Sequence, residues 1–256
     1  MNKNFWHKHG HTVIIYVFLA ALMVFVSIFN KDFFTLGNFK NLLRSSFPLL
    51  MAALGQTLII LTGGIDLSLG GIVALCNVVC VMSMNPDSAW GFVPALGAAA
   101  AVGLACGAVN GVLVTKGRLA PIIVTIATTA VFDGMALLLM PNPGGSVHKA
   151  FAKFLTRGYS GAVPFLLFIL ILCLVRSLAN STPYGKALRA IGGSENAAYS
   201  TGIRVGKIKF CAYCLAGLLC AVAGIFLSAQ MNSADATIGK NYAMNAITAT
   251  VVGGTA

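Results

Sequence analysis

The sequence is poor in charge and especially poor in acidic residues. Only 9% of its 256 residues are charged and 58% are hydrophobic, whereas soluble domains carry about 25% charged residues. The chain has 6 acidic residues against 17 lysines and arginines, which gives a net charge of +11. A water-soluble fold is excluded, because so few charged side chains cannot cover its surface. The basic residues fall mostly between apolar stretches, so we interpret them as topology signals and headgroup contacts and expect no nucleic-acid partner.

Patterns that carry catalysis or bind metals are also lacking. No G-x-x-x-x-G-K-[ST] sequence occurs, and no convincing arrangement of a nucleophile and a base is visible. Cys211 and Cys214 have the spacing of half a zinc site, but no second pair follows; all seven cysteines lie in apolar stretches, where we expect small packing residues and no disulfides. The alternating His7, His9 and His11 could bind a metal, although a flexible basic tail explains them better. We predict no catalytic residue, no metal and no cofactor.

Long apolar stretches predict an all-α fold, a polytopic transmembrane helix bundle. A transmembrane helix needs about 20 mostly apolar residues. About seven stretches reach or approach that length and an eighth begins: 12–29, 47–62, 71–84, 91–114, 121–140, 163–179, 208–229 and 243–252. The first follows a basic tail without a cleavage site, so we expect an uncleaved signal-anchor. We predict one transmembrane domain over residues 1–256.

Lysines and arginines predict the orientation, because cytoplasmic loops carry more of them. With a cytoplasmic N-terminus, ten face the cytoplasm: Lys3, Lys8, Lys116, Arg118, Arg176, Lys186, Arg189, Arg204, Lys207 and Lys209. Seven then face outward: Lys31, Lys40, Arg44, Lys149, Lys153, Arg157 and Lys240. The polar stretch 180–207 is therefore expected in the cytoplasm.

Glycines in stretch 91–114 follow a helical period. Gly103, Gly107 and Gly111 are spaced by four residues, in two overlapping GxxxG patterns. Such a pattern gives one helix face a smooth stripe that a second helix can approach closely. We predict a helix-packing role for these three residues.

A second group of glycines, between positions 63 and 70, breaks a helix inside apolar sequence. This segment contains Gly63, Gly64, Asp66 and Ser68. An irregular backbone at membrane depth requires burial in protein or a watery cavity. Three interpretations stay open: Asp66 or Ser68 caps a helix that begins near Gly71, the segment contacts a solute pathway, or it forms a short re-entrant loop near the cytoplasmic surface.

The polar stretch 180–207 interrupts the apolar sequence a second time. Ser194 is a plausible N-cap for a short helix that begins at Glu195 and ends at Gly202. Ala197 and Ala198 would give this helix a small, smooth surface that fits a groove on a partner. The alternative is an amphipathic loop that lies on lipid headgroups.

Two of these segments resemble signatures of permease subunits of ribose-type monosaccharide ATP-binding-cassette importers. They are Thr57–Ser68, TLIILTGGIDLS, and Gly192–Ile203, GGSENAAYSTGI; the latter is similar to the family's loop that docks on the ATPase. Asn110-Gly111 and region 239–255 also resemble the family, so the resemblance covers essentially the whole chain. It implies an ATPase-coupling role for Gly193, Glu195, Asn196, Ala197, Ala198 and Gly202, with Asn196 standing where the family often has glutamate.

The resemblance also implies a function and partners. The chain would move a ribose-like pentose or related sugar across the bacterial inner membrane by alternating access. Its partners would be an ATP-binding cassette ATPase subunit, a periplasmic or lipid-anchored sugar-binding protein, a second permease copy in a homo- or heterodimer, and the lipid bilayer. Hydrolysis of ATP would occur in the separate ATPase subunit, so the chain itself would not be an enzyme.

Family members usually continue for two or so helices past Gly253-Gly254-Thr255, so the resemblance implies a fragment or a shortened permease. The main alternative is an ATP-independent secondary transporter or channel for a small polar solute, in which the helix at 194–202 has no role. A membrane enzyme is a third interpretation, with no catalytic group to support it.

Overall fold

The computed structural model describes residues 3–88 and 90–255, with side chains from Val13 onward except at position 160. Its regular structure in these ranges consists of helices: α1 (Lys3–Phe29), α2 (Leu36–Ile60), α3 (Leu69–Met82), α4 (Phe92–Thr115), α5 (Pro121–Leu139), α6 (Lys149–Ser181), α7 (Pro183–Gly193), α8 (Glu195–Ser200), α9 (Val205–Met231) and α10 (Tyr242–Val252). The predicted all-α bundle is confirmed. The side chains of His7, His9 and His11 lie outside the described residues.

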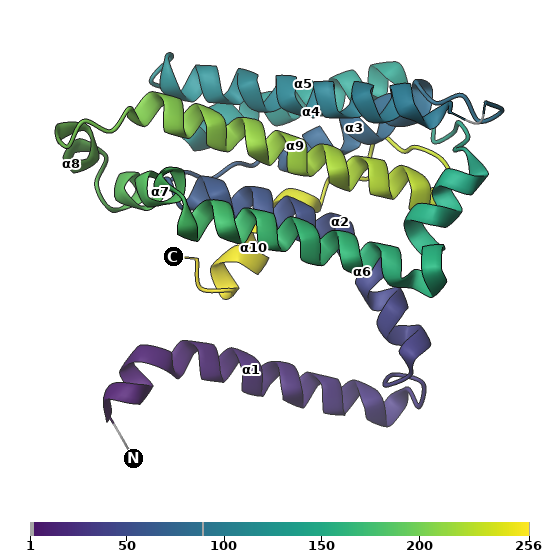
Figure 1. Ribbon diagram of the computed structural model, residues 1–256, viewed down its shortest axis with the longest axis horizontal. Helices are drawn as coiled ribbons and strands as arrows, with labels where there is room; N and C mark the ends of the chain where they lie inside the picture. The colour runs from purple at the N-terminus through teal and green to yellow at the C-terminus, as the bar shows by residue number, and fades with distance from the viewer. Residues whose placement is uncertain (1–2, 89, 256) are drawn as a thin grey trace.

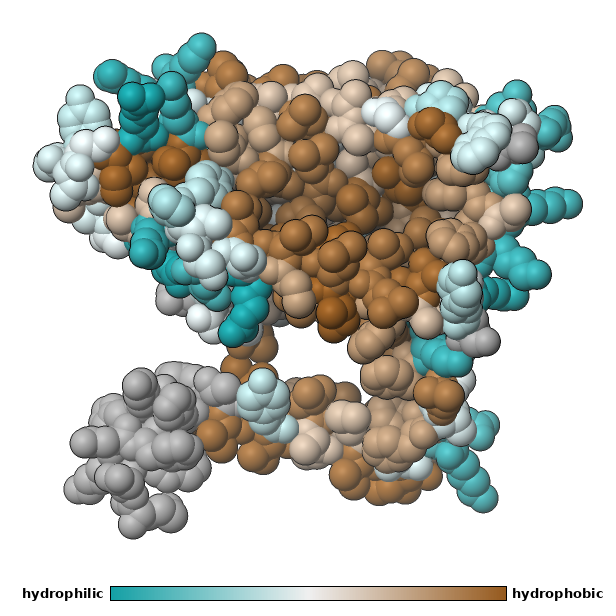
Figure 2. Space-filling model, in the orientation of Figure 1, coloured by the Kyte–Doolittle hydropathy of each residue, from teal (hydrophilic) through white to brown (hydrophobic). Residues whose placement is uncertain are grey.

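Five helices in the described ranges are long and apolar enough to cross a membrane: α2, α4, α5, the Gly161–Ser181 part of α6, and α9. The apolar part of α1 (Val13–Phe29), α3 and α10 are shorter. Figure 2 shows a hydrophobic band across the bundle, with hydrophilic residues gathered at its two ends. This distribution suits a protein whose flanks face lipid and whose ends face water.

Helix α9 is the centre of the bundle. Its most extensive contacts are with α4, α2 and α3, and α2 runs antiparallel to it, since Gly55 lies against Ala216 and the ring of Phe47 stacks on Phe226 at 4.3 Å. Helix α1 lies apart from the bundle (Figure 1) and exposes most of its described apolar side chains. The core of the bundle therefore lies around α9, where α2, α3 and α4 pack on it.

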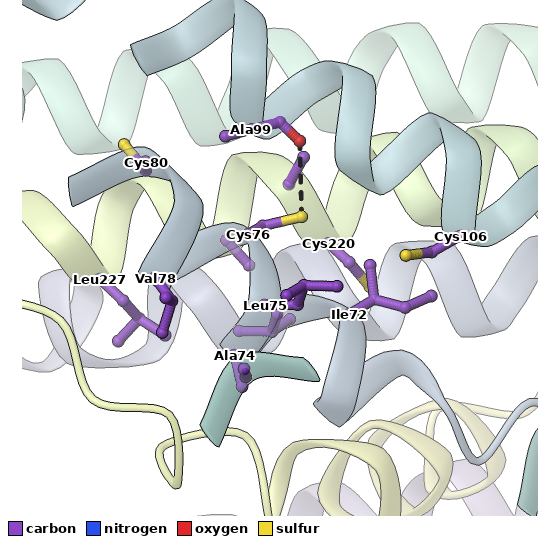
Figure 3. Close-up of a cluster of buried hydrophobic side chains, with 14 of the residues drawn as sticks. Ile72, Ala74, Leu75, Cys76, Val78, Cys80, Ala99, Cys106, Cys220 and Leu227 are labelled. Atoms are coloured by element: carbon purple, nitrogen blue, oxygen red, sulfur yellow. Dashed lines mark hydrogen bonds between the residues drawn. The ribbon is translucent and has the colours of Figure 1, made fainter. Parts of the chain in front are cut away.

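Small side chains make this core dense. In Figure 3, Cys76, Cys106 and Cys220 gather near Ile72, and Cys76 Sγ donates a hydrogen bond to Ala99 O at 3.4 Å. All seven cysteines are free thiols; Cys76, Cys80, Cys106 and Cys220 are buried, and Cys173 and Cys211 are exposed. Burial among apolar neighbours makes the four inner thiols packing residues.

Several helices extend beyond the apolar stretches that predicted them. Helix α2 begins at Leu36, eleven residues before the stretch at 47, because Thr35 caps it by accepting a hydrogen bond from Asn38 N at 3.3 Å. Helix α7 was not predicted at all: Thr182 caps it and Pro183 occupies its first position. Hydropathy delimits the part of a helix that lies in lipid, whereas caps delimit the helix itself.

Candidate functional site

The first break lies between α2 and α3 and is closed by a network of buried polar groups. Asp66 is 1% exposed, and its Oδ1 accepts hydrogen bonds from Ser68 N at 2.7 Å and Ser68 Oγ at 2.6 Å. Ser68 Oγ in turn accepts from Asn110 Nδ2 on α4 at 2.7 Å. With its amide oriented to suit its neighbours, Gln56 donates to Asp66 O at 3.0 Å and accepts from Asp66 N at 3.3 Å. The break is thus fixed to α2 and to α4.

Asp66 does not cap α3 directly, because Ser68 occupies the N-cap position and makes no side-chain capping hydrogen bond. The carboxylate of Asp66 instead closes the turn that leads into α3, which begins at Leu69, two residues earlier than the sequence suggested. Within the described residues the one ion pair joins Lys209 to Glu195, so the carboxylate of Asp66 has no cationic partner there. Helix α3 has 14 residues, or about 21 Å at 1.5 Å per residue, and therefore covers only part of the membrane.

A second turn of the same design precedes α10, and the sequence analysis missed it. Asp235 Oδ1 accepts from Thr237 N at 2.7 Å and from Thr237 Oγ1 at 2.8 Å, which matches the Asp66–Ser68 turn bond for bond. The signal was present in the sequence as D-x-[ST]-x-G, which occurs at 66–70 and again at 235–239. Helix α10 has only 11 residues, so both turns introduce short helices.

The two turns meet at their glycines. A Cβ on Gly70 would lie less than 3.0 Å from Gly239 O, and a Cβ on Gly239 equally close to Gly70 O. Each short helix packs on the long helix of the other unit: α3, which follows α2, packs on α9, and α10, which follows α9, packs on α2. The units α2–turn–α3 and α9–turn–α10 therefore make equivalent contacts. We conclude that the bundle contains an internal, inverted repeat of a long helix, an Asp turn and a short helix.

Asn77 joins the two halves of this repeat. Its side chain is fully buried on α3, where Nδ2 donates to Ser228 Oγ on α9 at 2.8 Å. Its Oδ1 accepts from Asp235 N at 3.0 Å, in the second turn. No sequence pattern marks Asn77, because its partners lie about 150 residues away in the chain. If the two halves move relative to each other, these hydrogen bonds must either break or move with the residues that form them.

A cavity of about 1200 Å³ opens between α2, α6, α7 and α10 at the end of the bundle that carries α8. Gly63 and Gly64 line it, whereas Asp66 and Ser68 do not. Its polar side chains are those of Thr57, Arg176, Asn180, Arg189 and Thr255. The structure therefore separates the four residues predicted at the break: the two glycines face the cavity, and the two polar side chains form the buried turn.

Helix α8 is a short helix at one end of the molecule (Figure 1). Ser194 Oγ accepts from Ala197 N at 3.3 Å, as predicted for an N-cap, and Gly202 ends the segment with a φ of +83°. Ala198 packs inward with Ile191 and Val205. Thus only part of the predicted Ala-Ala surface is free.

Exposed residues of α8 form its outer face: Glu195, Asn196, Ala197, Tyr199 and Ser200. Lys209 Nζ forms an ion pair with Glu195 Oε2 at 2.5 Å, which ties α8 to α9. Gly193 is also exposed, and a Cβ there would meet no neighbour. The six residues predicted for coupling are therefore neighbours in space as well as in sequence.

Helix α7 connects α8 to the first break. The backbone of Gly192 lies against Leu61 O so closely that a Cβ would have no room, and it lies next to Gly63. Tyr184 donates from its hydroxyl to Ile208 O at 3.3 Å, and burial raises the pKa of this phenol. A displacement of α8 can thus reach both α9 and the break through direct contacts.

The glycine stripe of α4 lies against α9. A Cβ on Gly103 would lie less than 3.0 Å from Gly217 O, one on Gly107 less than 3.0 Å from Tyr213 O, and one on Gly111 2.9 Å from the Phe210 ring. The close approach places α4 and its Asn110 within reach of Ser68. Helix α4 therefore carries both the close packing on α9 and one hydrogen bond of the polar network at the break.

In the described part of the chain, no group of three or more histidine, cysteine, aspartate or glutamate side chains could hold a metal ion. The arrangement consists of two short helices whose preceding turns meet in the bundle, a cavity beside the first break, and an exposed helix, α8, that reaches this break through α7. These features define a polytopic membrane protein of the permease class.

Comparison with known proteins gives the family. Residues 38–256 match the family of branched-chain amino acid transport system permease components, and the chain belongs to this family. The ribose import permease protein RbsC of Bacillus subtilis (strain 168) is 39% identical over 246 residues, which cover 93% of this chain and 74% of that protein. RbsC of Escherichia coli (strain K12) is 35% identical over 245 residues, with 93% and 75% covered.

A third relative has a different named solute. The fructose import permease protein FruF of Bifidobacterium longum (strain NCC 2705) is 32% identical over 257 residues, with 93% of this chain and 71% of that protein covered. No solved structure matches the chain.

Proposed function

We propose that this chain is the membrane-spanning subunit of an ATP-driven importer that carries a monosaccharide across the bacterial inner membrane. The observation that carries the proposal is α8, a capped helix with an exposed outer face, joined by α7 to a broken transmembrane helix. The named relatives import ribose or fructose, which favours a sugar over the branched-chain amino acids in the family's description.

The orientation follows from the same proposal. Helices α7 and α8 face the cytoplasm, where the ATPase is, and the N-terminus lies on that side. A sugar-binding protein delivers the solute at the opposite end. A second permease copy completes the pathway, as a homodimer or with a related chain.

ATP hydrolysis occurs in the separate subunit, and this chain converts its motion into alternating access. Closure of the ATPase subunits moves α8, which is linked to α9 through Glu195 and Lys209 and to the first break through α7 and Leu61. The cavity lined by Gly63 and Gly64 is then the inward opening of the pathway. Since a ligand shifts an equilibrium only by its differential affinity for the two states, the sugar binds weakly here and tightly to the binding protein.

Uptake into liposomes tests this function. The chain is reconstituted with its ATPase and binding-protein partners, and uptake of radiolabelled ribose, fructose and leucine is measured with and without ATP. We expect uptake of a sugar, and not of leucine, that requires both ATP and the binding protein. Sugar uptake that persists without ATP would favour a secondary transporter or channel, and uptake of leucine alone would refute the proposed solute class.

A further inference from the structure

Basic side chains from α2 and α6 surround a hollow at the end of the bundle opposite α8. This first hollow has a volume of about 430 Å³ and is lined by Arg44, Lys149, Lys153, Arg157, Gln230 and Asn232, among others. A second hollow of about 390 Å³ shares Arg44 and Arg157 and adds Lys40. Five cationic side chains therefore converge on two adjoining hollows.

Nothing in the described structure neutralises these charges. No acidic residue lines either hollow, and the only ion pair among the described residues lies at the other end of the molecule. Arg44 donates from Nη2 to Asn41 Oδ1 at 3.2 Å, but its buried Nε has no partner. A cluster of cations without acidic neighbours favours binding of an anion, and a phosphate oxygen suits the arginine donors.

An apolar groove continues from the second hollow. It is lined by Leu36, Phe39, Leu43, Tyr159, Ala162 and Phe165, and it shares Lys40 and Gly161 with the hollow. Phe39, Tyr159 and Phe165 remain 58%, 82% and 43% exposed. Charged hollows and apolar groove thus form one continuous surface between α2 and α6.

A break in α6 produces this combination. Tyr159 and Gly161 have positive φ angles of +47° and +88°, so the segment before them leaves the direction of the membrane span that begins at Gly161. The earlier segment carries Lys149, Lys153 and Arg157, and the later one carries Phe165. The break therefore places a basic surface next to an apolar surface that faces the lipid.

We propose that this surface binds an anionic phospholipid, with its phosphate in the basic hollows and one acyl chain along the apolar groove. A free anion would fill only the hollows, and an acidic protein surface would leave the groove empty on the lipid side; only an amphiphile satisfies both. Under the orientation given above, the lipid belongs to the outer leaflet. It joins the first turns of α2 to α6, next to the start of the span.

Lipid retention by the purified full-length chain tests this site. The chain in detergent is exposed to phosphatidylglycerol or to phosphatidylcholine of the same acyl length, and bound lipid is counted by native mass spectrometry. We expect phosphatidylglycerol to be retained preferentially. Arg44→Gln and Arg157→Gln should each lower its apparent affinity about fivefold, whereas the matched pair Lys116→Gln and Arg118→Gln, at the other end of the bundle, should leave it unchanged.

Further measurements distinguish a bound phospholipid from a bound inorganic phosphate ion. Phe165→Gln should weaken phosphatidylglycerol binding without affecting inorganic phosphate, because it changes the groove alone. If inorganic phosphate displaces the lipid completely at low concentration, the groove contributes nothing and the lipid proposal is wrong. It is also wrong if Arg44→Gln abolishes association with the sugar-binding protein while lipid retention is unchanged. Elution as a single peak in size-exclusion chromatography shows that each variant is folded.

Discussion

The approach of α4 to α9 can be tested by making one substitution at two glycines of the same helix. At Gly107 a Cβ would lie less than 3.0 Å from Tyr213 O, whereas at Gly97 it would meet nothing within 4 Å. Gly107→Ala must therefore push α9 away or strain both backbones. Gly97→Ala adds a methyl group that faces open space and restricts only the unfolded chain.

The two changes should have opposite signs. Overpacking of a tight contact costs about 1–3 kcal/mol, and replacing an exposed helical glycine with alanine stabilises by about 0.5–1 kcal/mol. The difference between the variants is then about 1.5–4 kcal/mol. At about 2–4 °C per kcal/mol for a chain of this size, their unfolding midpoints should differ by roughly 3–16 °C.

Buried thiols supply the assay. Cys76, Cys80, Cys106 and Cys220 are shielded in the folded protein, so a thiol-reactive dye in detergent reports their exposure as the temperature rises. The exposed Cys173 and Cys211 are replaced with alanine to lower the baseline. If Gly107→Ala unfolds at the same temperature as Gly97→Ala, or above it, the packing of α4 on α9 is not as described.

The same melting assay serves other positions. Asp66→Ala leaves a buried amide and hydroxyl without an acceptor and should lose about 1–3 kcal/mol for each, while Asp66→Asn keeps the Oδ1 acceptor and should lose less; equal losses would contradict the role of this side chain in closing the turn. Gly239→Ala should lower the midpoint by several degrees, because its Cβ would meet the opposite turn, and Gly134→Ala, with free space around it, should not; a harmless Gly239→Ala would refute the contact of the two turns. Ser194→Ala removes an N-cap worth about 1 kcal/mol and should speed amide hydrogen exchange in α8 without changing the midpoint; unchanged exchange would mean that the cap does not hold the helix.

Local patterns in the sequence predicted the parts of this structure that depend on neighbouring residues. The break near Gly63–Gly70 and the helix capped by Ser194 both follow from glycine and capping chemistry within a few positions. The approach of Gly103, Gly107 and Gly111 to a second helix was also readable, because a stripe of glycines needs no knowledge of its partner. The identity of that partner, α9, could not be predicted.

Contacts between distant segments were beyond sequence reasoning. Asn77 has no local signal, and its role arises only when α9 and the second turn come together around it. The repeat of the two turns was visible but not recognised, since they share only the aspartate, a hydroxyl residue and the glycine and precede helices of different length. Helix α7 was missed because its glycines and polar residues are also typical of a loop.

Coupling through α8 is the central claim, and ATP-driven sugar uptake by the Ala197→Arg variant tests it most directly. Ala197 is exposed on the outer face of α8, unlike the buried Ala198, so an arginine there obstructs docking without disturbing the fold. Ala197→Ser, which keeps the side chain at the same position small, is the matched control. We predict that Ala197→Arg abolishes uptake and the stimulation of ATPase activity by the binding protein, while Ala197→Ser retains both. Full uptake by a correctly inserted Ala197→Arg variant would contradict the account.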